Sequence, residues 1–404
     1  MISTTDTAGT AAETLPFFLI EGPVGSTMTV WTAAAAAILR AHPWRTEDPT
    51  AANLFFTTLE TAGETNWPVY GRQSAAFLGG GMRYFRDKVF DRIAALPFQG
   101  ETNRHVIFNL NPYSGYLDKF ADRRNFIFPS SSIAAADYRR FRDISFPVNP
   151  ILDLGAGDAR SARPEYFLTF RGADSHPVRR RLADLHNDRD VIVELLDMRS
   201  RAHLGEAHAG ATLAHDEIKR YAELMCNTAF ALVPRGDALF SYRLTEALAA
   251  GAIPVIVSDG WVLPFEDVLD YRAFSVVIPE ARCGDTLDIL RRLPEADIAR
   301  MRTAAGNAYR AQFATMSRQI NTLLAILHGW RRDGRWADGD DGANPDSELI
   351  RSTADFLNRR TREFDDLAVA RRHLAMDAGE RPKPSSASSP SKIVGKVGLR
   401  KIRK

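Results

Sequence analysis

Short apolar runs alternate with amphipathic segments along most of this chain, a pattern that predicts an α/β fold with mostly parallel sheets. In the first part, strands are predicted at 17–21, 53–59, 105–110, 125–128 and 144–148, with helices at 28–41 and 75–95. The run Pro147-Val-Asn-Pro150 interrupts the alternation. Proline fixes the backbone and removes a hydrogen-bond donor, so we expect an interdomain linker there.

The alternation resumes in the second part and predicts a second sheet of five strands. The strands are predicted at 165–171, 190–196, 228–233, 253–257 and 274–278, and the helices at 177–186, 214–226 and 239–249. Helical segments are predicted at 294–330, followed by a Gly/Asp-rich loop and a polar helix at 347–375. The predicted organisation is a disordered start at 1–14, domains at 15–150 and 151–330, a loop and helix at 331–380, and a tail at 381–404.

Composition fits two domains of ordinary size, because the chain has 404 residues and is 45% hydrophobic. The formal charge of +2 hides an asymmetry: the tail from Arg381 onward carries +8, so residues 1–380 carry 2 − 8 = −6. A nucleic-acid-binding body would be basic over one domain, so we expect no nucleic-acid partner. The two cysteines give no disulfide framework or metal cluster, which favours a reduced cytosol. The apolar stretches at 15–20 and 30–39 are too short to span a bilayer and follow no basic segment, so no signal peptide is expected.

Candidate chemistry is concentrated in residues 229–265, AFALVPRGDALFSYRLTEALAAGAIPVIVSDGWVLPF. The first apolar strand leads into Arg235-Gly236-Asp237, and the second leads into Ser258-Asp259-Gly260-Trp261. The helix between them carries Arg243 and Glu246 on one face, and Gly251 closes it. These groups should therefore gather at the carboxyl ends of parallel strands, where open α/β sheets hold nucleotides and a helix start favours anions.

The segment PRGDALFSYRLTEALAAGAIPVIVSDGWVLPF resembles the signature of exostosin-type glycosyltransferases. DPTAANLFF from Asp48, HVIFNL from His105, FRDISFP from Phe141 and RPEYFLTFRG from Arg163 resemble further family segments in the same order. The resemblance covers roughly residues 17–290. It implies a GT-B fold of two Rossmann-like domains facing a central cleft, a nucleotide-sugar donor (most often a UDP-sugar), a glycan or glycolipid acceptor, and inversion at the anomeric carbon. In such enzymes the helices after the second domain often cross back to the first.

The resemblance also implies roles for individual residues. Arg235 and Arg243 would stabilise the diphosphate leaving group, and Gly236 and Ser241 lie in the same donor-binding segment. Glu246 matches a glutamate that accepts hydrogen bonds from the donor ribose, and the alternative for it is a simple salt bridge with Arg243.

Two further groups are candidates for donor contact. Asp259, Gly260 and Trp261 form either a donor contact or a structural turn with Trp261 as a core anchor. A second set contains phosphate candidates: Arg171 and Gly172 end the strand at 165–171, and Arg179 and Arg180 open the helix that follows it.

A catalytic base is expected in the first domain, where a carboxylate or imidazole would take the proton of the acceptor hydroxyl. Asp118 matches the family aspartate after Ser114-Gly115 and is the candidate. Asp143 is its competitor, although its place beside the linker favours a structural role. His105 opens a strand, which also favours a structural role.

Two motifs suggest other chemistry. ILDLGAGD at 151–158 resembles the first motif of S-adenosylmethionine methyltransferases, but Pro164 follows too soon for the helix that this motif requires. Asp338-Gly-Asp340 has the form of the DxD metal site of GT-A transferases, but no strand precedes it. We therefore expect no metal and no cofactor. A catalytically silent exostosin-like subunit remains the non-enzymatic alternative.

The basic tail bears on location. KIVGKVGLRKIRK at 392–404 mixes six cationic residues with aliphatic ones after a Pro/Ser linker. It is either a solvated extension or a peripheral attachment to an anionic inner membrane surface. Eukaryotic members of the family usually carry an amino-terminal membrane anchor. We recognise none in this chain and expect a cytoplasmic, bacterial protein.

Overall fold

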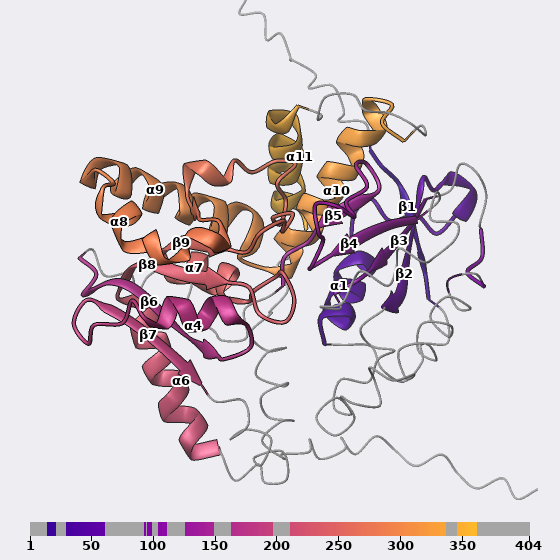
Figure 1. Ribbon diagram of the computed structural model, residues 1–404. Helices are drawn as coiled ribbons and strands as arrows, with labels where there is room; N and C mark the ends of the chain where they lie inside the picture. The colour runs from indigo at the N-terminus through magenta and orange to yellow at the C-terminus, as the bar shows by residue number, and fades with distance from the viewer. Residues whose placement is uncertain are drawn as a thin grey trace, which may run out of the picture.

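The protein contains two five-stranded parallel sheets, one from each half of the chain (Figure 1). The computed structural model describes residues 14–21, 30–60, 93, 95–98, 104–110, 126–148, 163–196, 211–336 and 346–361. This arrangement confirms the predicted α/β fold of GT-B type.

The strands of the first sheet lie in sequence order, and every pair is parallel. They are β1 (Phe17–Ile20), β2 (Leu54–Glu60), β3 (Arg104–Phe108), β4 (Phe126–Ser130) and β5 (Asp143–Ser145). Helix α1 (Val30–Arg40) packs against β2, and the short helix η1 (Pro49–Ala51) packs against β1. Every residue of β3 and β4 is buried, as expected for strands that are covered on both faces.

The second sheet has the strand order β10-β9-β8-β6-β7. Its strands are β6 (Tyr166–Ala173), β7 (Val191–Leu196), β8 (Thr228–Pro234), β9 (Ile253–Val257) and β10 (Val276–Val277). Its helices are α4 (Pro177–Ala183), α6 (Ala211–Cys226) and α7 (Arg243–Ala250). The chain passes from β6 outward to β7 and then returns to β8 on the other side of β6. A topological switch point therefore lies between β6 and β8, where doubly wound sheets form a crevice at their carboxyl ends.

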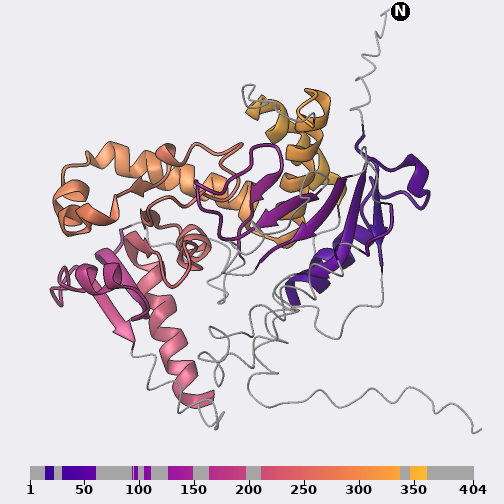
Figure 2. The ribbon, with the colours of Figure 1, turned by 45° about the vertical axis from the view of Figure 1, so that its right-hand side comes forward.

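Helices after the second sheet run back to the first half of the chain, as predicted (Figures 1 and 2). The short helix η7 (Tyr271–Ala273) lies between β9 and β10. After β10, the short helix η8 (Glu280–Asp285) leads into α8 (Thr286–Arg291), α9 (Glu295–Ala308), the π-helical turn η9 (Tyr309–Phe313), α10 (Met316–Arg332) and α11 (Ser347–Arg360). Helix α10 packs against α1 and α11. Just after α10, the carbonyl of Trp336 accepts a hydrogen bond from Arg142 Nη2 at 3.0 Å. These contacts hold α10 and the residues just after it against the first half of the chain.

The two halves also pair through their backbones. Ala134 and Trp261 form an antiparallel bridge. The Ala135 N–H donates to the Gly260 carbonyl at 2.7 Å, and the Val262 N–H donates to the Ile133 carbonyl at 3.0 Å. The loop that follows β9 is therefore part of the contact between the halves.

Two predicted helices differ from the structure by four residues or more at one end. The helix predicted at 239–249 begins only at Arg243, because the preceding loop has other partners. The Leu239 carbonyl accepts from Ser258 Oγ at 2.9 Å, and the Ala238 carbonyl accepts from the Gly236 N–H at 3.1 Å. The helix predicted at 347–375 ends at Arg360, because Thr361 takes an extended conformation.

Other predictions of local structure either agree with the structure or lie outside the described residues. The described strands agree with the predicted ones to within about three residues at each end. Gly251 ends α7 in the left-handed conformation with φ 74°, as predicted. The helix predicted at 75–95 lies almost wholly outside the described residues, and the domain boundaries stay predictions. Helices long and apolar enough to span a bilayer are absent from the described part of the chain.

Candidate functional site

The candidate arginines of the second half lie at the switch point of the second sheet. Arg171 and Gly172 lie near the carboxyl end of β6, and Arg235 follows β8 directly. Arg243 opens α7, and its Nε donates to the Arg171 carbonyl at 3.0 Å. The structure therefore brings the predicted arginines of two separate motifs together at one sheet edge.

Arg243 and Glu246 form an ion pair through Nη1 and Oε2, one turn apart on α7. Tyr221, on α6, donates its hydroxyl to the same Oε2 at 2.6 Å. The Arg243 guanidinium carbon lies 4.4 Å from the centre of the Tyr221 ring, within the range of a cation–π contact. Sequence reasoning missed Tyr221, because no pattern on α6 indicates that this aromatic residue meets α7.

The electrostatics of this cluster follow from its burial. Burial is the largest single effect on Arg243 and opposes its charge, but the charge and hydrogen bond of Glu246, together with Tyr221, outweigh burial and raise the pKa of Arg243. Burial and then the Glu246 charge raise the pKa of Tyr221 well above its ordinary value, so the phenol stays protonated and remains a donor. Arg243 is therefore held in its charged form.

One atom of the cluster lacks a partner. Glu246 is 0% exposed, and its Oε1 accepts no hydrogen bond within the described part of the chain. An unsatisfied buried carboxylate oxygen is costly and rare, so it marks a place where a donor from a ligand or a rearrangement would be favourable.

Arg179 joins the ends of β6 and β8. Its guanidinium donates to the carbonyls of Ala173 at 2.9 Å, Pro234 at 3.2 Å and Arg235 at 2.8 Å. Burial, and then the positive charge of Arg243, lower its pKa to about 10. Three of its donors are thus engaged by backbone, and its predicted phosphate contact stays a prediction.

Gly236 is favoured by this packing. A Cβ at this position would lie 3.0 Å from both Arg179 Nη2 and Ser175 Oγ, which is tighter than side chains normally tolerate. The glycine lets the loop after β8 pass directly beside the buried guanidinium.

Arg235 pairs with Glu280, whose Oε1 lies 3.7 Å from Nη1. Glu280 also accepts from the Asp259 N–H at 2.9 Å, and its own N–H donates to Asp259 Oδ1 at 2.9 Å. Asp259 therefore ties the end of β9 to η8, and Glu280 positions Arg235. The position of Glu280 just after the last predicted strand is the signal that could have identified it.

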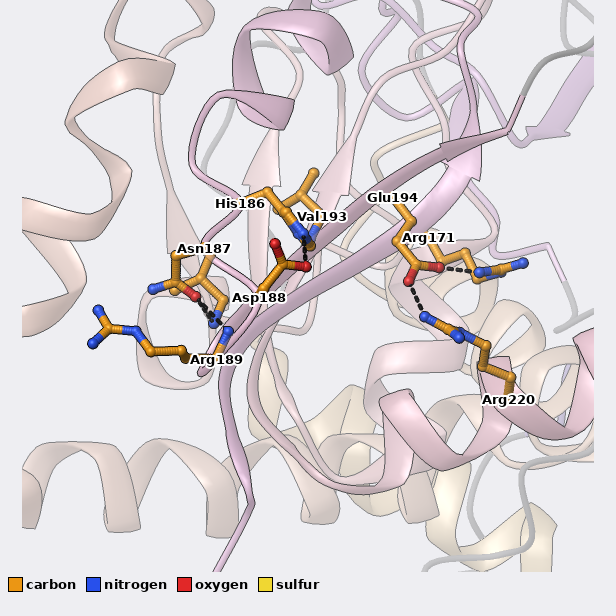
Figure 3. Close-up of polar contacts among 9 residues, drawn as sticks. Arg171, His186, Asn187, Asp188, Arg189, Val193, Glu194 and Arg220 are labelled. Atoms are coloured by element: carbon orange, nitrogen blue, oxygen red, sulfur yellow. Dashed lines mark hydrogen bonds and ion pairs between the residues drawn. The ribbon is translucent and has the colours of Figure 1, made fainter.

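Arg171 forms an ion pair with Glu194, the residue directly opposite it on β7 (Figure 3). Glu194 lies between Arg171 and Arg220, and its other oxygen pairs with Arg220 of α6. The turn into β7 holds this register, because Asn187 Oδ1 accepts from the N–H groups of Arg189 and Val191, each at 3.0 Å. Glu194 was missed because strand pairing, rather than sequence spacing, brings it to Arg171.

Three other predicted residues have clear structural settings. Ser241 is buried, and its hydroxyl accepts weakly from the Arg243 N–H at 3.4 Å at the start of α7. Gly260 has φ +73°, a conformation that favours glycine. Trp261 is 8% exposed and packs in the core shared by the two halves. A donor contact by Gly260 or Trp261 stays a prediction.

Among the candidate residues of the first half, Asp143 and His105 belong to the described part of the chain. Asp118 lies outside the described residues. Both carboxylate oxygens of Asp143 are bound by Arg139, with Arg139 Nη2 at 2.5 Å from Oδ1 and Nε at 3.0 Å from Oδ2. Burial lowers the pKa of His105, and its Nε2 lies 2.8 Å from the Pro97 carbonyl. These settings agree with the structural roles expected for Asp143 and His105.

Metal and cofactor motifs gain no support. Among the described residues, His, Cys, Asp and Glu side chains form no group that could hold a metal ion. The motifs at 151–158 and 338–340 lie outside the described residues. The described site thus offers guanidinium groups at a sheet edge and one unsatisfied carboxylate oxygen, a combination suited to a diphosphate attached to a hydroxyl-bearing group.

Residues 24–293 match the family model described as "Exostosin GT47 domain". The chain is 29% identical over 303 residues to Exostosin-1 of Drosophila melanogaster, a match that covers 70% of this chain and 38% of the fly protein. It is 28% identical over 319 residues to Exostosin-2 of Bos taurus, covering 76% of this chain and 41% of the bovine protein. The chain therefore spans about two fifths of the length of these curated relatives. Both relatives are animal proteins, and a bacterial origin stays a prediction.

Among solved structures, the chain is similar to WaaG, described as a glycosyltransferase involved in lipopolysaccharide biosynthesis. The TM-score is 0.35 at 13% identity, covering 78% of this chain and 99% of that one. A likeness at that score is too weak to bear on the function of this chain.

Proposed function

Because the chain belongs to the exostosin GT47 family of glycosyltransferases, we propose that it transfers a sugar from a UDP-sugar to a hydroxyl group of a glycan or glycolipid, with inversion at the anomeric carbon. The observation that carries this proposal is the Arg243–Glu246 pair at the switch point, in which one buried carboxylate oxygen has no hydrogen-bond donor among the described residues. The pair lies at the edge where doubly wound sheets hold nucleotides.

In the proposed reaction, Arg243 and Arg235 stabilise the diphosphate as negative charge develops on it. The bond from the anomeric carbon to the diphosphate oxygen breaks, and its electron pair leaves with UDP. Guanidinium groups that are already positioned lower the energy of this charge without reorganising at the moment of reaction. This role requires no resident metal, and we propose that none is used.

In the proposed complex, Oε1 of Glu246 accepts a hydrogen bond from a hydroxyl group of the donor ribose. Its carboxylate is fully buried in this conformation, so ribose reaches Oε1 only after neighbouring side chains move. The simple salt bridge with Arg243 is the competing role, and the experiment below separates the two.

The acceptor oxygen forms the new bond to the anomeric carbon on the face opposite the leaving diphosphate. Its proton passes to a carboxylate of the first domain, for which we propose Asp118. The arginine contacts to both oxygens of Asp143 support this choice, because that carboxylate is already engaged.

We also propose that the protein acts in the cytoplasm and contacts an anionic membrane surface through residues 392–404. The six cations of this segment support the idea, because each cation near such a surface contributes about 1 kcal/mol. A lipid-linked acceptor would be concentrated at the same surface.

The test combines UDP binding with UDP release. A hundredfold excess of UDP over its dissociation constant should stabilise the wild-type protein by about 2.7 kcal/mol, and S-adenosylhomocysteine should have no effect. Glu246→Gln should weaken UDP binding by about 1–3 kcal/mol, because a hydrogen bond to a charged group is lost. Glu223→Gln is the matched control, since Glu223 is exposed on α6 and its one ion pair among the described residues is with Lys219.

The outcomes separate the candidate functions. UDP release from one sugar nucleotide in a panel, together with an acceptor, would identify the donor and support transfer. Binding of UDP without release from any member of the panel would favour the catalytically silent subunit. A Glu246→Gln variant that binds UDP normally but unfolds at lower temperature would assign Glu246 to the salt bridge alone.

A further inference from the structure

Helix α6 contacts two of the three arginine–glutamate pairs described in the candidate site, through two consecutive residues. Arg220 pairs with Glu194, the partner of Arg171. Tyr221 donates to Glu246, the partner of Arg243. Consecutive residues of a helix point about 100° apart, so one residue can reach β7 while the next reaches α7.

We propose that Tyr221 is a positioning residue of the donor site, holding Arg243 and Glu246 in the arrangement that binds the nucleotide diphosphate. This inference rests on the proposed function, because it assigns Tyr221 a part in that same site. Tyr221 lies outside the sequence segment that carries the family resemblance to the donor site, 22 residues before Arg243 in the chain.

The geometry gives Tyr221 two separate actions. Its hydroxyl donates to Oε2 of Glu246 at 2.6 Å, and Arg243 Nη1 binds that same oxygen. Both donors therefore occupy one carboxylate oxygen, which leaves Oε1 for a ligand hydroxyl. Its ring lies beneath the guanidinium, 4.4 Å from the centre of the ring to Cζ, and limits the movement of Arg243.

Packing alone does not account for the hydroxyl group. Tyr221 is 5% exposed and belongs to the apolar core that includes Leu244 and Leu248 of α7. A phenylalanine would fill the same space. The hydroxyl is therefore the part of the side chain that serves Glu246, and it can be removed without changing the shape of the core.

Tyr221→Phe is the test variant, because it keeps the ring beneath Arg243 and removes only the hydroxyl. We expect UDP to bind about tenfold more weakly, because Glu246 loses one of the two donors that hold its carboxylate in the binding arrangement. The value of kcat/KM for the donor should fall by a similar factor. KM for the acceptor should stay the same, because the acceptor does not contact this cluster in the proposed reaction.

Tyr271→Phe is the matched control. Tyr271 is 6% exposed, and its hydroxyl donates to the Pro264 carbonyl at 2.7 Å. This substitution also removes one buried tyrosine hydrogen bond, but it does so away from Arg243 and Glu246. We expect UDP affinity within about twofold of wild type, whatever the change in melting temperature.

A double-mutant cycle tests whether Tyr221 acts through Glu246. In a Glu246→Gln background, Tyr221→Phe should weaken UDP binding by much less than tenfold, because the carboxylate that the hydroxyl orients is gone. Fully additive losses would contradict the proposed route through Glu246.

The outcomes are distinct. Unchanged UDP affinity in Tyr221→Phe, or equal losses in Tyr221→Phe and Tyr271→Phe, would overturn the positioning role while leaving the proposed function intact. A wild-type protein that binds no UDP would overturn the proposed function and this inference together. If Tyr221→Phe binds UDP more weakly at an unchanged melting temperature, the positioning role is supported.

Discussion

Replacing Asp267 with asparagine should make the protein more stable at neutral pH. Asp267 follows β9 and is 7% exposed. Burial, and then the neighbouring Glu266 charge, raise its pKa from 3.8 to about 7, although a hydrogen bond from Tyr138 and the charge of Arg140 act to lower it. Tyr138 belongs to the connection between β4 and β5 in the first half, so the carboxyl lies where the two halves meet.

The sign of the effect follows from linkage. The folded state holds a proton on Asp267 that the unfolded chain gives up at lower pH, so this group favours folding below pH 4 and loses that contribution as pH rises to about 7. A difference of about three pKa units corresponds to roughly 4 kcal/mol lost at neutral pH. Asparagine never ionises and avoids this loss.

The assay is urea unfolding of wild type and Asp267→Asn at pH 5, 6, 7 and 8. The free energy of unfolding of the variant, relative to that of wild type, should rise by about 2–3 kcal/mol between pH 5 and pH 8. This difference should level off above pH 7. Tyr138→Phe removes a hydrogen bond that lowers the pKa of Asp267, so it should shift the wild-type pH profile to higher pH. A stability difference between wild type and Asp267→Asn that is constant across this pH range would refute the reasoning.

Three further predictions concern catalysis and location. Arg243→Lys should raise the activation free energy that corresponds to kcat/KM for the donor by about 1.5–3 kcal/mol, because a lysine ammonium cannot supply the planar fork of a guanidinium. Wild-type kinetics in this variant would remove Arg243 from the site. Asp118→Asn should cut turnover by about 10²–10⁴-fold and leave UDP affinity unchanged, as measured by UDP release and calorimetry. Near-normal turnover would pass the role of base to another residue. Deleting residues 382–404 should abolish sedimentation with anionic vesicles at low salt while UDP affinity stays constant. Full-length protein that ignores such vesicles would make the tail a solvated extension.

The sequence by itself determined the order of strands and helices and the edge at which the arginines meet. Apolar runs such as 253–257 and amphipathic segments such as 214–226 indicate which element forms, because the spacing of buried positions differs between strands and helices. Parallel strands place their carboxyl ends at one edge, so Arg235 and Arg171 could be assigned to that edge without knowing the strand order.

Apart from Glu246, which shares a helix with Arg243, only the tertiary structure decided which side chains meet those arginines. Glu194 reaches Arg171 through the register of β6 and β7, Tyr221 reaches Arg243 through the packing of α6 on α7, and Glu280 reaches Arg235 from η8. Hydrophobic periodicity states which face of an element is buried but not which other element covers it. The strand order that makes β6 and β8 neighbours depends on packing over the whole domain. The partners of the candidate site therefore come from segments that no local pattern connects to it.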